Sequence, residues 1–181
     1  MQFRVLLLVF SAVFSFVLPP VSIAKTANNL ILPGYRDEEK GDYAQAAKLY
    51  EQACNGGDAH ACAALADLYM YKGGRGVKHD VAQAAKLYEQ ACNGGDARAC
   101  TELGSLYEKG RGVKQDYAQA KKFYEQACNS GFGKACYYLG GLYLSATGNR
   151  QDFSTAKEYF KKSCDLGYQV ACDYYQEMNI Q

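Results

Sequence analysis

The sequence lacks tryptophan and contains only two histidines. With so few histidines, it has no cluster that would serve a catalytic zinc site. Of its 20 basic residues only Arg4 precedes residue 25, which leaves 19 basic and 19 acidic side chains in the rest of the chain. This absence of net charge argues against nucleic acid or an anionic membrane as the partner. No stretch alternates between apolar and polar residues as a half-buried strand does.

Long apolar runs are also absent, apart from one near the N-terminus. Val5 to Leu18 is an uninterrupted apolar segment of about 14 residues, whereas a membrane-spanning helix needs about 20. A basic residue, Arg4, precedes the run, and Ser22-Ile23-Ala24 is typical of a signal-peptide cleavage site. A membrane span is the alternative interpretation, but the length favours a cleaved signal peptide over residues 1–24. We therefore expect a secreted or periplasmic product that keeps no membrane anchor after cleavage.

Cysteine is abundant, with eight residues in 181. Such a content is unusual for a cytosolic protein and common in exported ones, where thiols are oxidised to disulfides. The first of them, Cys54, lies far from the cleavage site, so the sequence offers no lipid-anchor cysteine. Both the signal and the cysteines predict an oxidising compartment.

A segment of 17 residues is repeated along the chain. The sequence from Asp42 to Asp58 recurs almost unchanged from Asp80 to Asp96, again from Asp116 and more loosely from Asp152. The starting residues give a first spacing of 38 and two further spacings of 36. A fixed period of this length indicates a repeat architecture.

Each copy predicts two helices. Apolar residues at three-and-four spacing mark a first helix that begins after the aspartate, whose carboxylate can cap its free amides. Asp42, Asp80, Asp116 and Asp152 are the four expected capping residues. Asn55-Gly56-Gly57 ends the first helix, Asp58 caps a second, and a glycine-rich link with Gly-x-Gly-Val follows. The tyrosines at repeated positions, such as Tyr50 and Tyr88, are expected to be buried.

None of these hairpins can bury its apolar face alone, so neighbours must stack. The predicted fold is all-α, an αα-hairpin repeat solenoid that forms a right-handed superhelix of about four repeats. The predicted repeats cover residues 42–79, 80–115, 116–151 and 152–181. Residues 25–41 are expected to form an N-terminal cap, in which Pro33-Gly34 interrupts any helix.

The eight cysteines form four pairs, each eight residues apart. They are Cys54 and Cys62, Cys92 and Cys100, Cys128 and Cys136, and Cys164 and Cys172. One member ends the first helix and the other opens the second, so a short turn brings them within disulfide distance. Zinc binding is the alternative, but its cysteines usually lie two to four residues apart. We predict four local disulfides, with no metal and no cofactor.

The repeated motifs resemble a known family. Ala-x-x-Tyr-x-x-Ala-Cys, Ala-Cys-x-x-Leu-Gly-x-Leu-Tyr and Gly-x-Gly-Val resemble the Sel-one-like repeat, which is related to the tetratricopeptide repeat. The paired cysteines, together with Cys164-Asp-Leu-Gly and Ala171-Cys172-Asp173, resemble the bacterial Hcp-type cysteine-rich secreted proteins. The resemblance implies one disulfide per repeat. It also implies either contacts with host proteins or penicillin binding with β-lactamase activity.

A catalytic motif is not evident in the sequence. Ser-x-x-Lys occurs at Ser154 and Lys157, but Ser-Asp-Asn and Lys-Thr-Gly, which accompany it in serine β-lactamases, are absent. A second match, from Ser22 to Lys25, would be cut by signal cleavage. The catalytic residues of any β-lactamase activity are therefore unknown, with Ser154 and Lys157 as the only candidates.

A polar pattern on the first helices gives the main functional hint. It consists of Gln45, Lys48 and Gln52, then Gln83, Lys86 and Gln90, then Gln119, Lys122 and Gln126. Three-and-four spacing places each trio on one helix face, and stacking would align the trios into a polar strip. The strip is either a solvated surface or a site for a protein, a peptide or a peptidoglycan fragment. We predict a monomeric scaffold that binds such a ligand in its groove, with β-lactam hydrolysis as the alternative.

Overall fold

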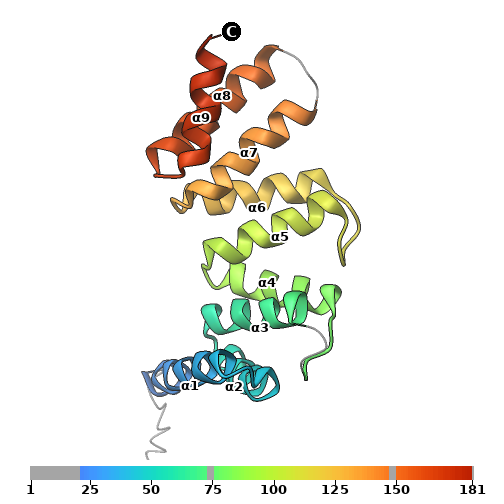
Figure 1. Cartoon of the computed structure of the whole chain (residues 1–181), viewed down its shortest axis with the longest axis vertical. Coiled ribbons are helices and arrows are strands. Elements are labelled where there is room, and N and C mark those ends of the chain that lie inside the picture. Colours follow the sequence, from blue (N-terminus) through green and yellow to red (C-terminus); the bar gives the residue numbers. More distant parts are fainter. Residues whose placement is uncertain (1–20, 73–75, 147–149, 181) are drawn as a thin grey trace, which may run out of the picture.

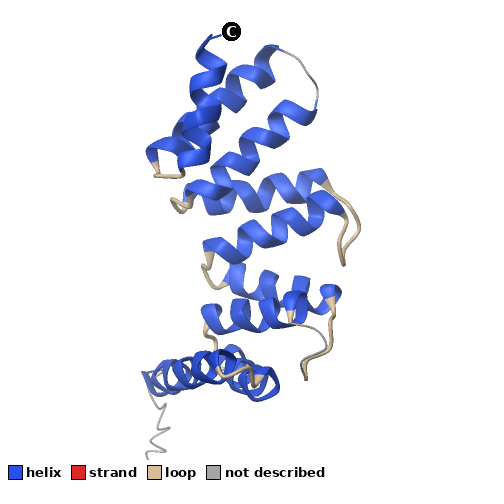
Figure 2. Cartoon of the chain, viewed as in Figure 1, coloured by secondary structure: helices blue, strands red, loops and turns tan. Residues whose placement is uncertain are grey.

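The computed structural model describes residues 21–72, 76–146 and 150–180, and within these ranges the regular structure is helical throughout (Figures 1 and 2). The helices are α1 (Val21–Glu39), α2 (Tyr43–Asn55), α3 (Ala59–Tyr71), α4 (Val81–Asn93), α5 (Ala97–Lys109), α6 (Tyr117–Asn129), α7 (Gly133–Ala146), α8 (Arg150–Asp165) and α9 (Gln169–Ile180). The predicted signal peptide lies outside the described residues, except for its last four, which open α1.

The helices follow one another in a single stack from α1 to α9, in the order of the sequence (Figure 1). Each helix packs mainly against the helix before it and the helix after it in the chain. Contacts between neighbours therefore replace the long-range contacts of a globular core, as expected for a repeat protein. The predicted all-α solenoid of hairpin repeats is confirmed.

A bulky ring fills the same position of every even-numbered helix from α2 to α8. Tyr50, Tyr88 and Tyr124 have no exposed surface, and Phe160 is 2% exposed. Small residues on the preceding helix admit these rings: a Cβ atom on Gly104 would lie 2.7 Å from the ring of Tyr124. In three of the hairpins that an odd helix forms with the even helix after it, α1–α2, α5–α6 and α7–α8, the ring thus packs directly on a helix backbone at Gly34, Gly104 and Gly140.

The predicted interruption at Pro33-Gly34 is wrong, because α1 continues through both residues. Proline inside a helix removes one backbone hydrogen bond, so local helix propensity alone predicts a break at this position. Here α1 packs along α2, and Gly34 lies so close to Tyr50 that a Cβ atom would be 2.4 Å from a ring carbon. Tertiary packing therefore outweighs the local preference, and α1 takes the same place against α2 that α5 takes against α6.

Carboxylates cap most of the helices as predicted. The Asp42 carboxylate accepts from the amide of Gln45, and Asp80 and Asp116 accept at the equivalent positions of α4 and α6. Asp58 accepts from the amide of Ala61 at the start of α3. The expectation that Asp152 precedes its helix is wrong, because α8 begins at Arg150 and Asp152 lies in its first turn. A carboxylate in a first turn still interacts favourably with the helix dipole.

Four disulfides connect consecutive helices. They join Cys54 to Cys62, Cys92 to Cys100, Cys128 to Cys136, and Cys164 to Cys172. Their Cα atoms are 4.6 to 4.8 Å apart, within the range that an unstrained disulfide requires. One disulfide per repeat, with each bridge across a turn between two helices, is therefore confirmed.

Candidate binding surfaces

The odd-numbered helices α3, α5 and α7 carry ion pairs that cross from one hairpin to the next. Arg98 on α5 pairs with Asp67 on α3 at 2.9 Å, and Lys134 on α7 pairs with Glu102 on α5 at 3.3 Å. Tyr71, at the end of α3, is 60% exposed. Burial is the largest cause of the raised pKa of Tyr71, and the carboxylates of Glu102 and Asp67 raise it further. We call the surface formed by these five residues the odd-helix face.

Buried tyrosine hydroxyls donate hydrogen bonds to carboxylates on the odd-helix face and next to it. The hydroxyl of Tyr88 donates to Asp67 at 2.5 Å, and the hydroxyl of Tyr124 donates to Glu108 at 2.7 Å. Tyr50 donates to Glu38 in the first hairpin at 3.1 Å. Burial and the adjacent carboxylate raise the pKa of each of the three tyrosines above its ordinary value. The carboxylates are therefore held in position by contacts within the chain itself.

An open cavity of about 600 Å³ lies at the α1 end of the odd-helix face. Its lining consists of Tyr35, Glu38, Glu39, Tyr43, Ala64, Asp67, Lys72 and Arg98. Tyr35 is 44% exposed and contacts Tyr50 edge-on, with ring centroids 5.5 Å apart. The ammonium group of Lys72 lies 5.2 Å from the ring centre of Tyr43. The cavity thus offers aromatic rings and charges of both signs to a ligand.

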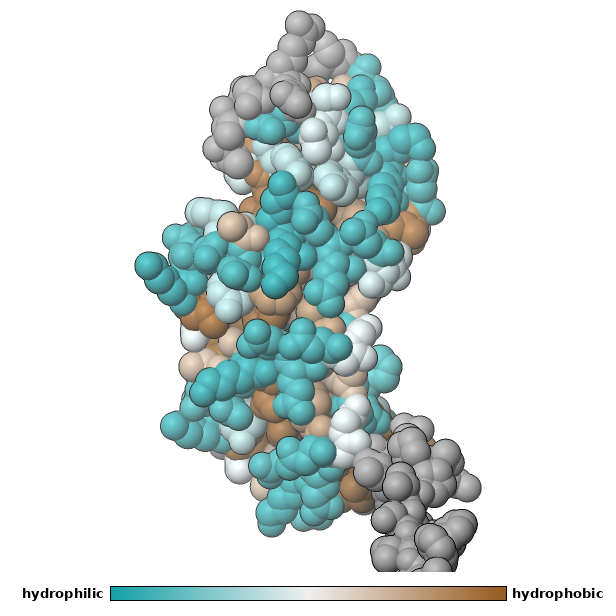
Figure 3. Space-filling model, turned by 180° about the vertical axis from the view of Figure 1, so that it is seen from behind, coloured by the Kyte–Doolittle hydropathy of each residue, from teal (hydrophilic) through white to brown (hydrophobic). Residues whose placement is uncertain are grey.

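The residues of the predicted polar strip lie on the even-numbered helices α2, α4 and α6. Lys48, Lys86 and Lys122 are exposed, whereas Gln83 and Gln119 are partly buried. Gln126 reaches back along the stack and donates to the backbone carbonyl of Cys92 at 3.3 Å. Figure 3 shows that on one face of the molecule the hydrophilic residues form patches separated by hydrophobic bands. The role of the strip in binding stays a prediction.

The candidate catalytic pair lies on α8. Ser154 is exposed, and the ammonium group of Lys157 donates to the backbone carbonyl of Met178 on α9 at 3.4 Å. Lys157 thus contacts α9, and no feature of the described residues supports the β-lactamase alternative. Within the described residues, no group of three potential metal ligands is present. Among the same residues, no helix is long and apolar enough to cross a membrane.

The odd-helix face was missed by the sequence analysis, although a signal for it exists. His60, Arg98 and Lys134 are separated by 38 and then 36 residues, which is the repeat spacing, so a basic side chain recurs at one repeat position. His60 contacts Asp96, and its Nδ1 atom lies 2.7 Å from the carboxylate. The acidic partners Asp96, Asp67 and Glu102 occupy three different repeat positions, and this irregularity hides them from a search for repeats.

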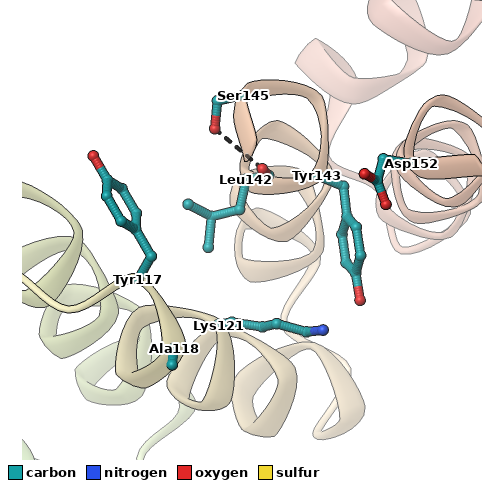
Figure 4. Close-up of a pocket in the computed structure, with 7 residues that line it drawn as sticks. All are labelled: Tyr117, Ala118, Lys121, Leu142, Tyr143, Ser145 and Asp152. Atoms are coloured by element: carbon teal, nitrogen blue, oxygen red, sulfur yellow. Dashed lines mark hydrogen bonds between the residues drawn. The ribbon is translucent and has the colours of Figure 1, made fainter. Parts of the chain in front are cut away.

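A second cavity, of about 490 Å³, lies between α6, α7 and the start of α8 (Figure 4). Its lining consists of Tyr117, Ala118, Lys121, Leu142, Tyr143, Ser145 and Asp152. Most of this lining is aromatic or aliphatic, in contrast to the charged cavity at the odd-helix face. The two cavities share no residue.

The Sel1 repeat matches four consecutive segments of the sequence, residues 24–58, 59–96, 97–132 and 133–168. Comparison with curated proteins finds no match. Among solved structures, c5321, a protective antigen of uropathogenic Escherichia coli strains that displays an SLR fold, is similar at a TM-score of 0.75 and 24% identity. That match covers 85% of this chain and 34% of c5321, so the chain spans about a third of its length.

Two further structures are similar over most of this chain. A Sel1 repeat protein from Oxalobacter formigenes matches with a TM-score of 0.69 and 25% identity, over 88% of this chain and 63% of that protein. Cysteine-rich protein B of Helicobacter pylori (HcpB) matches with a TM-score of 0.48 and 27% identity, over 62% of this chain and 94% of HcpB.

Proposed function

The chain belongs to the Sel1 repeat family, and from this premise we propose that it is an exported scaffold that binds a protein or peptide on its odd-helix face. Four buried or half-buried disulfides support export, because such bridges persist in oxidising compartments. The repeat family supports binding, since stacked repeats create extended surfaces that hold a partner.

The cavity of about 600 Å³ between α1, α2, α3 and α5 carries the proposal. It places Tyr35 and Arg98, residue types that are enriched at binding hot spots, beside carboxylates already held by buried hydroxyls. A ligand that carries both a basic and an acidic group would find partners in Asp67 and Arg98. An extended peptide fits these requirements, because its side chains can reach successive hairpins.

Photo-crosslinking tests the site. A benzoylphenylalanine residue is placed at Tyr71 on the odd-helix face or at Lys86 on the polar strip, and each oxidised protein is exposed to the culture medium or host extract. We expect adducts from position 71 and a loss of these adducts when Arg98→Ala is added. Substitution of the exposed Glu89 to alanine serves as the matched control and should leave the adducts unchanged.

Adducts from position 86 alone would move the site to the polar strip. Adducts from neither position would contradict a binding role for both surfaces. Binding that survives both Arg98→Ala and Glu102→Ala would show that the ion-paired residues of the odd-helix face serve stability alone.

A further inference from the structure

Two lysines of this chain each contact a carboxylate and a tyrosine ring at the same time. The ammonium group of Lys134 lies 3.3 Å from the carboxylate of Glu102 and 5.6 Å from the ring centre of Tyr138. Lys121 has the same two kinds of partner, a carboxylate at 3.8 Å and a tyrosine ring centre at 4.7 Å. The carboxylate and the ring face both attract a cation, so together they form a site for a basic side chain.

Helix α9 presents the same pair of groups at the end of the stack (Figure 1). Tyr174 and Glu177 are three residues apart, so they are neighbours on one face of the helix, and both are exposed. The ring of Tyr174 is held by the rings of Phe160 and Tyr137, with centroids 5.6 Å and 5.4 Å away. Among the described residues, neither Tyr174 nor Glu177 has a basic side chain as a partner.

The repeat indicates the direction in which Glu177 points. Glu177 occupies the repeat position of Asp67, since one spacing of 38 residues and two of 36 separate them. Asp67 pairs with Arg98 on the next odd-numbered helix, so it lies on the side of α3 that faces α5. Glu177 therefore lies on the side of α9 that faces away from α7. The repeat position of Arg98 itself is occupied on α9 by Val170, which is 44% exposed.

Val170 and Tyr174 do not lie on the side of α9 that corresponds to the helix-stacking side of α7. The residues of α7 that contact α8 include Gly133, Tyr137, Gly140 and Tyr143. Their counterparts on α9, 36 residues later, are all polar and exposed, and they are Gln169, Asp173, Gln176 and Asn179. Helix stacking therefore does not explain the exposed apolar residues of α9.

We propose that Val170, Tyr174 and Glu177 bind an extended segment of a partner protein that combines an aliphatic residue with an arginine or a lysine. The basic group lies between the carboxylate of Glu177 and the ring of Tyr174, and the aliphatic side chain contacts Val170. Val170 and Glu177 are about 10.5 Å apart along the helix axis. An extended chain covers this distance in about three residues, which sets the spacing between the two residues of the ligand.

The size of this surface favours a short segment over a second copy of the chain. A stable protein interface needs about 800 Å² from each partner, whereas this surface consists of three side chains that are each partly covered. The surface shares no residue with the odd-helix face, and the proposal does not depend on the function proposed there.

A nuclear magnetic resonance titration of the oxidised full chain tests the proposal. The probe is the acetylated and amidated peptide Leu-Ala-Ala-Arg, and the control peptide has citrulline, an uncharged analogue of similar shape, in place of arginine. We expect saturable shifts at Val170, Tyr174 and Glu177 with the probe. The citrulline peptide should bind about fivefold more weakly or worse, because it lacks the positive charge.

Two variants on α9 locate the basic group of the peptide. Glu177→Gln should weaken binding of the arginine peptide by about two- to fivefold and reduce its advantage over the citrulline peptide. Asp173→Asn is the matched control, because it removes an exposed carboxylate from the polar side of the same helix. It should leave the dissociation constant within about twofold. Arg98→Ala should also have no effect, which separates this surface from the odd-helix face.

The absence of saturable shifts, equal affinity for both peptides, or equal losses in Glu177→Gln and Asp173→Asn would each overturn the proposal. Dilution of the protein without peptide tests the other occupant. Shifts of Val170 and Tyr174 that depend on protein concentration would identify a second copy of the chain on this surface, and they would overturn the proposal as well.

Discussion

At the scale of single residues, the hydroxyl of Tyr124 and the carboxylate of Glu108 are replaced together one repeat later. Tyr124 donates to Glu108 in the third hairpin. One repeat later, 36 residues further in each case, the chain has Phe160 and Leu144. A buried polar group without a partner costs more than a well-packed apolar pair. The fourth hairpin therefore avoids an unpaired hydroxyl by replacing both members with apolar residues.

This relation predicts strong coupling between Tyr124 and Glu108. Tyr124→Phe and Glu108→Leu should each lower the free energy of unfolding by about 1 to 2 kcal/mol. The double variant reproduces the pair found in the fourth hairpin, so its loss should be smaller than the sum by at least about 0.5 kcal/mol. Urea denaturation of the oxidised protein measures all three. Additive losses would show that the hydrogen bond contributes nothing of its own.

The same tyrosines predict a stability limit at alkaline pH. Burial and carboxylates raise the pKa of Tyr50, Tyr88 and Tyr124 above the ordinary value of 10.0. Above that pH the unfolded chain loses phenolic protons that the folded chain keeps, so stability is complete below pH 10 and falls as the pH rises. For each of these tyrosines, the free energy of unfolding should fall by about 1.4 kcal/mol per pH unit above its unfolded-state pKa.

The measurement is the free energy of unfolding between pH 8 and about pH 11, completed quickly so that the disulfides stay intact. Tyr88→Phe is the informative variant, because it removes one titrating group from the buried set. Its stability curve should fall less steeply above pH 10 than that of the unchanged protein. Parallel curves would show that Tyr88 ionises with the same pKa in the folded and unfolded states.

At the scale of helices, the sequence predicted what depends on local pattern and failed where packing decides. The spacing of Ala46, Tyr50 and Ala53 predicts the buried face of α2, and all three are fully buried. Pro33 predicts a break in α1 that does not occur, because the contact between Gly34 and Tyr50 joins residues on two different helices. Neither helix propensity nor the three-and-four spacing of apolar residues can predict such a contact.

Close ring packing predicts opposite effects for two glycines on neighbouring odd helices. Gly104→Ala places a Cβ 2.7 Å from the Tyr124 ring, so overpacking should exceed the helix-propensity gain and lower stability by about 1 to 3 kcal/mol. A Cβ on Gly141 of α7 would meet no heavy atom within 4 Å, so Gly141→Ala should raise stability by about 0.5 to 1 kcal/mol. Thermal unfolding measures both.

The comparison of the two alanine variants isolates packing from propensity, because both substitutions replace a helical glycine by the same residue. Stabilisation by Gly104→Ala would contradict the ring-on-backbone contact. Destabilisation by Gly141→Ala would mean that its helix face meets a neighbour elsewhere in the stack.

At the scale of the whole molecule, the residue at which a repeat is taken to begin decides whether a disulfide lies within one repeat or joins two repeats. The predicted units begin at residues 42, 80, 116 and 152, whereas the Sel1 repeat segments begin at residues 24, 59, 97 and 133. A periodic sequence has no unique starting point, so spacing alone could not decide between them. In the Sel1 frame the ring of Tyr124 packs on Gly104 within one unit, while Cys92–Cys100 joins two consecutive units.

The cross-unit contacts explain why the odd-helix face, the candidate binding surface, was the hardest part to predict. The pair of Arg98 and Asp67 joins residues 31 apart, and the pair of Lys134 and Glu102 joins residues 32 apart. Neither separation equals the repeat period, since the acidic partners lie on different turns of their helices. Only the stacking of the helices brings these partners together, and the sequence pattern does not predict how the helices stack.

Bridges between units also predict an order of reduction along the stack. The six cysteines of the first three disulfides are at most 2% exposed, whereas Cys164 and Cys172 are half-buried. Thiol exchange requires access of the attacking thiolate to a sulfur. In a limited dithiothreitol titration followed by alkylation and mass spectrometry, Cys164 and Cys172 should therefore be labelled first.

Because the disulfide between Cys164 and Cys172 connects α9 to the stack, amide exchange should then rise in α9 and stay low in α4 and α5. Simultaneous labelling of all eight cysteines would instead indicate that the solenoid opens as one cooperative unit before any disulfide is reduced.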